Sequence, residues 1–279
     1  MRGLIENRLD GKVVNLPSVR RQYIAFVHES MPTRTYALFP DDMERWLEAL
    51  SGKYTADIMA NIHQLVLTDL MLSSLCLLDS KRLKTQHTHT HTHTHTHTHA
   101  HHSHINAPHS HIEMLPPVVI ESVLAWFGYL VESMTAGDYE PDLVSDLFRK
   151  DLAISALNMW PSSSICHYER RTLPRRFLTA NGIAQFASAT DMLLRKIKDR
   201  RSMYEFHMED RRKNPHFLEA GWREFYLEIA QRLTTEPHIS GIFAQSWFWD
   251  PEVSKACPKM KYLRALPQAG GAMFYLIEE

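Results

Sequence analysis

Few cysteines, little net charge and no long hydrophobic run characterise this 279-residue chain, and each scarcity excludes a class of protein. The three cysteines, Cys76, Cys166 and Cys257, are too few and too scattered for a disulfide framework, which favours a reducing compartment. Lysine and arginine number 31 against 32 acidic residues, so a wholly basic nucleic-acid coat protein and an acidic tail protein are both excluded. Hydrophobic residues still make up 44%, which suffices for the core of one long domain or two short ones.

An uninterrupted apolar segment of the length that crosses a bilayer, about 20 residues, is also missing. The most apolar stretch, Ile58 to Leu78, contains Asn61, Gln64 and Asp69, and a carboxylate in mid-span would be unfavourable in lipid. Residues 1–16 mix charged and apolar side chains and lack the apolar run of a signal peptide. We therefore predict a buried helix over Ile58 to Leu78 and expect a cytoplasmic protein.

Histidine and threonine alternate strictly from His87 to His99, within the segment QHTHTHTHTHTHTHAHHSH. Neutral imidazoles are good ligands for zinc, nickel and copper, so this His–Thr tract could bind metal. However, the alternation provides no fixed ligand geometry and no apolar face to bury, and a CA dinucleotide repeat in the gene encodes the same pattern. We expect a disordered linker over about 84–113 that binds metal only incidentally.

Helical periodicity dominates the rest of the first 200 residues. Besides Ile58 to Leu78, helices are predicted after Pro116-Pro117 with Gly137 at the end, from Pro141, and from Thr179 to about Arg200. The sequence therefore predicts a mainly helical region over residues 1–200, which the linker interrupts.

After residue 200 the pattern changes. Met203 to Glu209 alternates apolar and polar residues, which predicts a strand. A helix is predicted from Phe217 to Thr235, and further strands over Ile239 to Trp249 and Ala272 to Ile277. This order predicts a mixed α/β region over 201–279, and the whole chain is expected to be α+β. Because the chain ends directly after the last predicted strand, a terminal element could be missing.

Positive charge is concentrated between residues 170 and 213, which hold twelve lysines and arginines against five acids. Most runs of this kind are solvated helix faces. The alternative is a binding site for an anionic ligand that carries phosphates. Nucleic acid is not expected, because no recognised motif and no interleaved aromatic residues accompany the charge.

The strand from Met203 offers the clearest candidate chemistry. His207, Glu209 and Arg211 would share one face if the strand continued, and a histidine beside a carboxylate can act as a general base. Polar side chains that simply face solvent are the other interpretation. His-x-Glu is also two thirds of a facial metal triad, but neither His216 nor His238 lies on a convincing facing strand, so no metal is expected here.

Three other segments are weaker candidates for a binding or catalytic site. Arg211-Arg212-Lys213 precedes a predicted helix, whose N-terminus favours phosphate, although no glycine-rich loop accompanies it. Ser246 lacks the G-x-S-x-G elbow of a serine hydrolase, and Trp247 and Trp249 suit a core. Cys166-His167 follows a serine-rich segment and is interpreted as part of a loop rather than as a thiol nucleophile and its base.

The C-terminal quarter, about residues 203–276, contains YEFHMED, a helix with EAGWREFYLEIAQRL, and then AQSWFWDPEVSKACPKMKYLRAL. It resembles the C-terminal domain of bacterial acyltransferase-like proteins of the GNAT type, which are acetyl-CoA-dependent N-acyltransferases. The residues that carry the resemblance are His207, Ser246, Trp247, Asp250, Pro251 and Pro258. The pyrophosphate loop of that fold, Gln/Arg-x-x-Gly-x-Gly/Ala, is not visible, and only the position of Tyr262 suggests a general acid.

The resemblance implies a sheet in which acyl-CoA lies between two splayed strands and transfers its acyl group to a small-molecule amine or hydroxyl. The expected site residues are His207 and Glu209 as the catalytic pair, Arg211, Arg212 and Lys213 as the cofactor-binding cations, and Ser246, Trp247 and Asp250 as substrate contacts. Two alternatives stay open, a GNAT-like module that binds without turnover and a metal-binding protein that uses the His–Thr tract. No membrane partner is expected.

Overall fold

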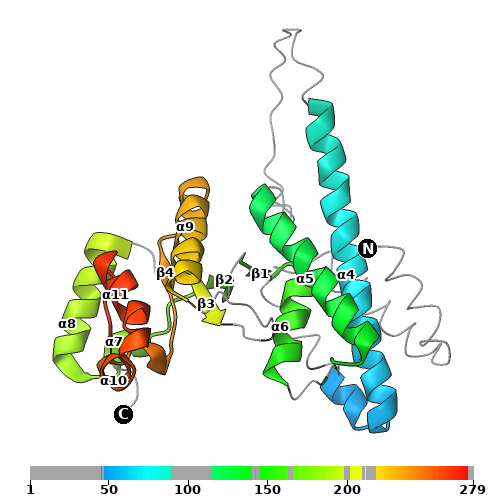
Figure 1. Cartoon of the computed structure of the whole chain (residues 1–279), viewed down its shortest axis with the longest axis horizontal. Helices are drawn as coiled ribbons and strands as arrows, with labels where there is room; N and C mark the ends of the chain where they lie inside the picture. The colour runs from blue at the N-terminus through cyan, green and yellow to red at the C-terminus, as the bar shows by residue number, and fades with distance from the viewer. Residues whose placement is uncertain are drawn as a thin grey trace. The chain divides into compact units, whose positions relative to one another are not determined.

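The computed structural model describes residues 45, 47–88, 115–139, 142, 145–162, 166–197, 202–208, 211 and 218–275. Helices and a four-stranded mixed sheet make up these residues, so the α+β class is confirmed (Figure 1). The chain divides into two compact units, Met1–Met159 and Trp160–Glu279. This boundary precedes the expected one at residue 200, because a strand that ends at Arg171 pairs with the strand that begins at Met203.

The first unit is helical over its described residues. Its main elements are α4 (Ala56–Thr88), α5 (Pro117–Ala136) and α6 (Asp146–Ser155), with a shorter helical segment at 47–51. Helix α5 begins after Pro116, since proline suits the first helical turn, and ends at Gly137, whose φ of 80° turns its N–H toward the carbonyl of Ser133. The predicted linker begins inside α4, and residues 89–113 lie outside the described residues.

Two segments of this unit, Ile58–Leu78 and Pro117–Ala136, are long and apolar enough to cross a membrane, each with a mean hydropathy of 1.3. In the structure 61% of the first and 44% of the second segment is buried, and core helices of soluble proteins meet the same criteria. Val66, Leu67 and Met71 have no exposed surface. The predicted burial of the helix over Ile58 to Leu78 is therefore confirmed for its apolar face.

The second unit is built on a sheet with the order β1-β2-β3-β4. The strands are β1 (Met159–Pro161), β2 (Cys166–Arg171), β3 (Met203–Met208) and β4 (Ile242–Phe243). Strands β2 and β3 are antiparallel, whereas β3 and β4 are parallel and are connected through helix α9 (Glu219–Thr235). The strand at Met203 and the helix that ends at Thr235 are confirmed. The loop predicted at Cys166-His167 is wrong, because both residues belong to β2.

The register of β2 and β3 separates two chemically different faces. Tyr168 lies opposite Phe206, and both contact the ring of Phe225 on α9, with ring centres 6.5 Å and 5.0 Å away. On the other face Glu169 lies opposite Glu205, and His167 lies opposite His207. Because side chains alternate along a strand, the helix covers the aromatic face and leaves the carboxylates and imidazoles on the opposite face.

A buried cation fixes α9 to the aromatic face of the sheet. The guanidinium carbon of Arg232 lies 4.1 Å from the ring centre of Trp160, 5.0 Å from that of Tyr168 and 4.9 Å from that of Tyr204. Arg232 Nε donates to Glu236 Oε1 at 2.7 Å, and Nη1 donates to the Tyr168 hydroxyl at 2.8 Å. Such stacking is favourable when the cation is desolvated, and Arg232 is 2% exposed.

Helices also pack against one end of the polar face. The segment between β2 and β3 forms α7 (Arg176–Thr179), α8 (Gly182–Met192) and a π-helical turn (Leu193–Ile197). Leu173 and Phe177 form a core with Met203 and Phe243, and partly buried residues of this segment pack against it. Since Met203 lies on the same face as Glu205 and His207, the apolar core ends where the polar residues begin.

The segment after β4 differs from the prediction. The strand expected over Ile239 to Trp249 is wrong beyond Phe243, because the chain turns at Ser246 into a 3₁₀ turn (Trp247–Trp249). Helix α10 (Pro251–Ala256), a second 3₁₀ turn (Pro258–Met260) and helix α11 (Tyr262–Ala269) follow. The expected last strand is also wrong over 272–275, which has no regular structure, and the residues after 275 lie outside the described chain.

Candidate functional site

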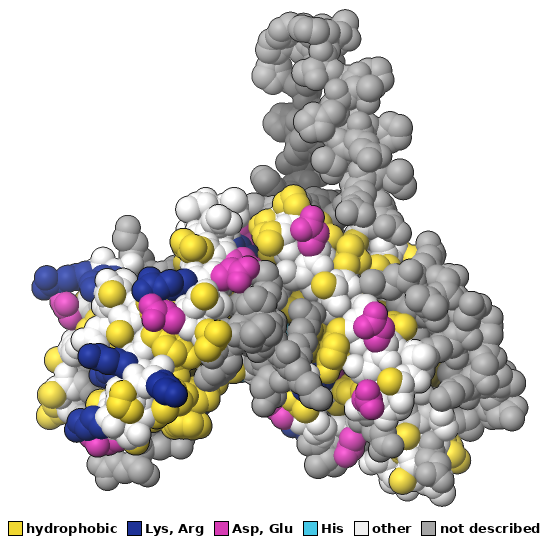
Figure 2. Space-filling model, in the orientation of Figure 1, with side chains coloured by type: hydrophobic (Ala, Val, Ile, Leu, Met, Phe, Trp, Pro, Cys, Tyr) yellow, Lys and Arg dark blue, Asp and Glu magenta, His cyan; other side chains and the backbone are white. Residues whose placement is uncertain are grey.

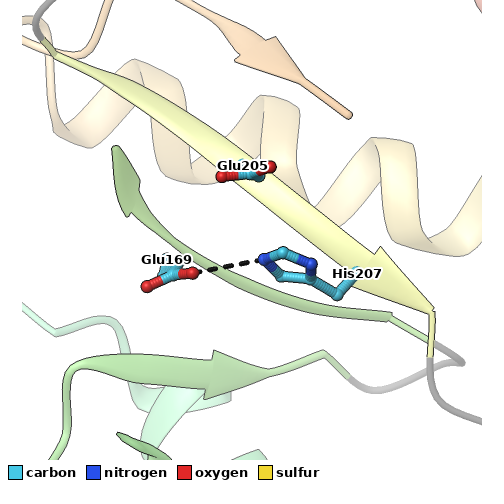
Figure 3. Close-up of side chains that lie close together, drawn as sticks. All are labelled: Glu169, Glu205 and His207. Carbon is cyan, nitrogen blue, oxygen red and sulfur yellow. Dashed lines mark hydrogen bonds and ion pairs between the residues drawn. The ribbon is translucent and has the colours of Figure 1, made fainter. Parts of the chain in front are cut away.

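Glu169, Glu205 and His207 form a compact group on the polar face of the sheet, which we call the EEH cluster (Figure 3). One carboxylate oxygen of each glutamate and a ring nitrogen of the histidine all lie within 4.8 Å of one another. The closest pair is Glu169 Oε1 and His207 Nε2, at 3.2 Å. A carboxylate and an imidazole at this distance form a hydrogen bond that fixes the ring and its tautomer.

The register of the sheet brings the three residues together. Glu169 lies directly opposite Glu205 in the antiparallel pair, and His207 is two residues further along β3. Residues two apart on one strand share a face, and a diagonal cross-strand neighbour lies within reach of a long side chain. Two paired strands hold all three positions, so the cluster is a property of the sheet rather than of a loop.

An arginine neutralises one edge of the EEH cluster. Arg171 Nε lies 3.0 Å from Glu169 Oε2, which leaves Oε1 of the same carboxylate toward His207. The side chain of Arg171 is 55% exposed, whereas that of Glu169 is only 12% exposed. The arginine therefore orients the carboxylate from the solvent side, and the contact between glutamate and histidine lies beneath it.

Glu205 is electrostatically disfavoured in its charged form. Partial burial raises the pKa of Glu205 most, and the nearby Glu169 carboxylate raises it further, against the opposing influence of His207, Arg171 and Arg176. No described residue donates a hydrogen bond to its carboxylate. The group is therefore poised to take up a proton or a cation.

Within the EEH cluster, His207 lies where β3 continues beyond its parallel neighbour. The pairing of β3 with β4 covers only Tyr204 with Ile242 and Glu205 with Phe243, whereas β3 extends to Met208. On that side His207 has no strand partner among the described residues. Its side chain is 28% exposed, so part of the ring is accessible to solvent.

The described residues do not show the expected cofactor-binding cations, Arg211, Arg212 and Lys213, in contact with this cluster. Glu209, Arg212 and Lys213 lie outside the described residues, and Arg211 is half-buried just beyond the end of β3. Figure 2 shows other lysine and arginine side chains over the part of the second unit that contains α8, α10 and α11. In the same unit, the side chains of Arg195 and Lys255 are 79% and 71% exposed.

The three expected substrate contacts have local structural roles. The Ser246 hydroxyl accepts a hydrogen bond from the Phe248 N–H at 3.2 Å, and Asp250 Oδ1 accepts one from the Glu252 N–H at 2.7 Å. Trp247 is 66% exposed and stacks on Phe248 with ring centres 4.1 Å apart. Serine and aspartate are favoured helix-capping residues, so the Ser-Trp-x-x-Asp-Pro string can be explained as two successive caps.

Of the three residues in the cluster, sequence analysis named only His207 as a candidate site residue. Glu205 precedes His207 by two positions in a strand that was predicted, so the alternation alone placed it on the same face. Glu169 carried no such signal, because no strand was predicted around it and the nearby Cys166-His167 was interpreted as part of a loop.

No protein-family model, curated protein or solved structure matches this chain. The chemistry of the site therefore depends on its own geometry. A histidine held by a carboxylate can accept a proton from an alcohol or amine, and the same three side chains could hold a divalent cation.

Proposed function

We propose that the protein is an acyl-CoA-dependent acyltransferase whose general base is His207. The observation that carries the proposal is the hydrogen bond between Glu169 Oε1 and His207 Nε2, 3.2 Å long. His207 lies on the part of β3 that extends beyond its pairing with β4. The strand–helix–strand connection β3-α9-β4 with a parallel pair agrees with the implied GNAT-like architecture. None of the three described cysteines forms a disulfide, which suits the cytoplasmic location that we also propose.

Glu169 positions the imidazole for proton transfer. When Nε2 carries the ring proton and donates it to Glu169 Oε1, the lone pair of Nδ1 is available as the base. Nδ1 then takes the proton from an amine or hydroxyl acceptor as it attacks the acyl carbon, and Glu169 stabilises the imidazolium that results. Burial of the Glu169 side chain, which is 12% exposed, strengthens this interaction relative to one in water.

The acyl-CoA thioester would supply the activated acyl group. Its amide-bearing arm can form hydrogen bonds with the edge of β3 beyond Glu205, because β4 ends at Phe243 and leaves this edge unpaired within the described residues. Arg211 is the described member of the basic segment proposed to hold the phosphates, together with Arg212 and Lys213.

Steady-state turnover with a panel of acyl-CoAs and amine acceptors tests the proposal, with release of the CoA thiol as the signal. We expect His207→Ala to lower kcat by about 10²–10⁴-fold, the usual contribution of a general base. His238→Ala is the matched control, since His238 is half-exposed, lies outside the strands and is not one of the three cluster residues. Unchanged turnover in His207→Ala would contradict the catalytic role.

The non-catalytic alternative makes a different prediction for the same variant. A GNAT-like module that only binds would show calorimetric binding of acyl-CoA in both the wild type and His207→Ala, with no thiol release in either. An absence of heat with every acyl-CoA would refute both versions.

A further inference from the structure

Besides proton transfer, the EEH cluster has the ligand atoms of a metal site. Two carboxylates and one imidazole converge from two paired strands, and no hydrogen-bond donor among the described residues satisfies Glu205. We propose that Glu169, Glu205 and His207 bind a first-row divalent cation of the Mn²⁺ and Fe²⁺ class. This inference does not rest on the acyltransferase function.

The distances suit a cation between the closest pair. Two ligand atoms that each lie about 2.1 Å from a metal are about 3.0 Å apart at a right angle and about 3.4 Å apart at a tetrahedral angle. Glu169 Oε1 and His207 Nε2 are 3.2 Å apart, between these values. The third ligand atom lies within 4.8 Å of the others, so a change of torsion in the Glu205 side chain completes the set.

The charges of the EEH cluster also favour a divalent cation. Glu169 and Glu205 repel each other across the strand pair, and Arg171, which lies 3.0 Å from Glu169, and Arg176 offset this repulsion only in part for Glu205. A divalent cation would relieve the repulsion and would place a positive charge in direct contact with Glu205, which forms no ion pair among the described residues. The paired strands fix the ligand positions before the cation arrives, which reduces the entropy lost on binding.

The donor set selects the metal. Carboxylate oxygens suit Mn²⁺, and one imidazole extends the preference toward Fe²⁺, whereas the absence of thiolate among the three ligands disfavours soft cations. Sequence analysis expected no metal here because it looked for the third ligand at His216 or His238. The structure supplies it instead from Glu169, and Glu205 takes the place given to Glu209.

A divalent cation bound to the EEH cluster would prevent His207 from acting as the general base. A cation bound to Nε2 forces the ring proton onto Nδ1, the nitrogen that accepts the substrate proton in the proposed reaction. Mn²⁺ binding and proton abstraction by His207 are therefore mutually exclusive, and Mn²⁺ is expected to inhibit transfer.

Titration of the full-length protein with Mn²⁺, followed by electron paramagnetic resonance without any acyl-CoA, tests the proposal. Mn²⁺ is the suitable probe because the His–Thr tract offers imidazoles without carboxylates, which is a poor site for this ion. We expect one bound ion per chain that is lost in His207→Ala. Glu205→Gln keeps the size of the side chain but removes its charge. We expect it to lower the Mn²⁺ affinity by more than roughly 10–100-fold, which is the usual effect of losing a residue that only hydrogen-bonds a metal ligand. His238→Ala, and a variant without residues 87–104, should bind as the wild type does.

Equal Mn²⁺ stoichiometry and affinity in the wild type and Glu205→Gln would overturn the proposal, as would a wild-type protein that binds no Mn²⁺. Thermal unfolding separates loss of the site from loss of the fold. Mn²⁺ should raise the Tm of the wild type and of His238→Ala but not that of Glu205→Gln. Failure of acyl transfer leaves these measurements unaffected, so the two proposals can fail separately.

Discussion

Glu236 is a buried carboxylate that accepts hydrogen bonds from three side chains. Arg232, Arg170 and the Tyr204 hydroxyl all donate to it, and its side chain has no exposed surface. Burial alone would raise the pKa of Glu236, but Arg232 and these hydrogen bonds outweigh burial and lower it. The carboxylate therefore stays charged in the folded state and holds α9 against the sheet.

Because the folded-state pKa of Glu236 lies below its ordinary value of about 4.3, its stabilising effect is complete above that pH and is lost as the pH falls through the folded value. We expect the free energy of unfolding of the wild type to fall below about pH 4, and the fall to be shallower in Glu236→Gln. At pH 7 the same variant should be destabilised by about 3–5 kcal/mol, because it leaves the buried Arg232 without its anion. Urea unfolding at several pH values measures both effects, and parallel pH profiles would contradict this account.

Glu169 gives a second prediction at the scale of the residue. If it positions His207, Glu169→Gln should lower kcat by about 10–100-fold while the KM for acyl-CoA stays the same, since misplacement of a base affects the chemical step. A rise in KM with unchanged kcat would show instead that Glu169 contributes to binding.

At the scale of the element, Asp250 separates a structural from a functional role for the Ser-Trp-x-x-Asp-Pro string. Its carboxylate accepts the Glu252 N–H at the start of α10. Asp250→Ala should lower the free energy of unfolding by about 0.5–2 kcal/mol, the usual effect of losing an N-cap. If the residue is only a cap, acyl-CoA turnover stays the same, whereas a stable variant with lost turnover would support the expected substrate contact.

How far the elements could be predicted depended on whether local pattern determined them. Proline and glycine marked both ends of α5, and alternation marked β3, so both were predicted correctly. Strand β2 is six residues long and becomes a strand through its full register with β3, which is more than thirty residues later in the chain. Such long-range pairing leaves little local signal, and for that reason Glu169 was missed.

Helix α8 shows a different limit. Phe186 of α8 and Leu194 of the turn that follows it share the helical spacing of the apolar residues, yet they are 49% and 75% exposed. The buried positions of α8 are Gln185 and Ala189, and the Gln185 amide donates to the Phe177 carbonyl at 3.1 Å. Apolar periodicity predicted a helix here but not the side that packs, because contacts with other parts of the chain decide which side is buried.

At the scale of the whole molecule, all described parts of the candidate site belong to one unit. Strands β2 and β3 and helix α9 lie within Trp160–Glu279, as does the buried Arg232 network. We expect a fragment of residues 158–279 to fold cooperatively and to keep the Mn²⁺ site. Circular dichroism and denaturant unfolding would measure this, and a fragment that is unfolded under native conditions would show that the site depends on the helical unit.

The sequence also misplaced the boundary of this unit, since the expected division at residue 200 separates β2 from β3. Helical pattern before residue 200 and strand pattern after it suggested a change of domain. The compact unit instead joins both patterns through sheet pairing, which composition along the chain does not reveal.

The central claim is that substrate binds on the polar face of the sheet around His207. Amide hydrogen exchange of the full-length protein with and without acetyl-CoA tests it most directly. The account predicts slower exchange in β3, Met203–Met208, in the presence of acetyl-CoA. Unchanged exchange in β3 with protection elsewhere, or with none at all, would contradict it.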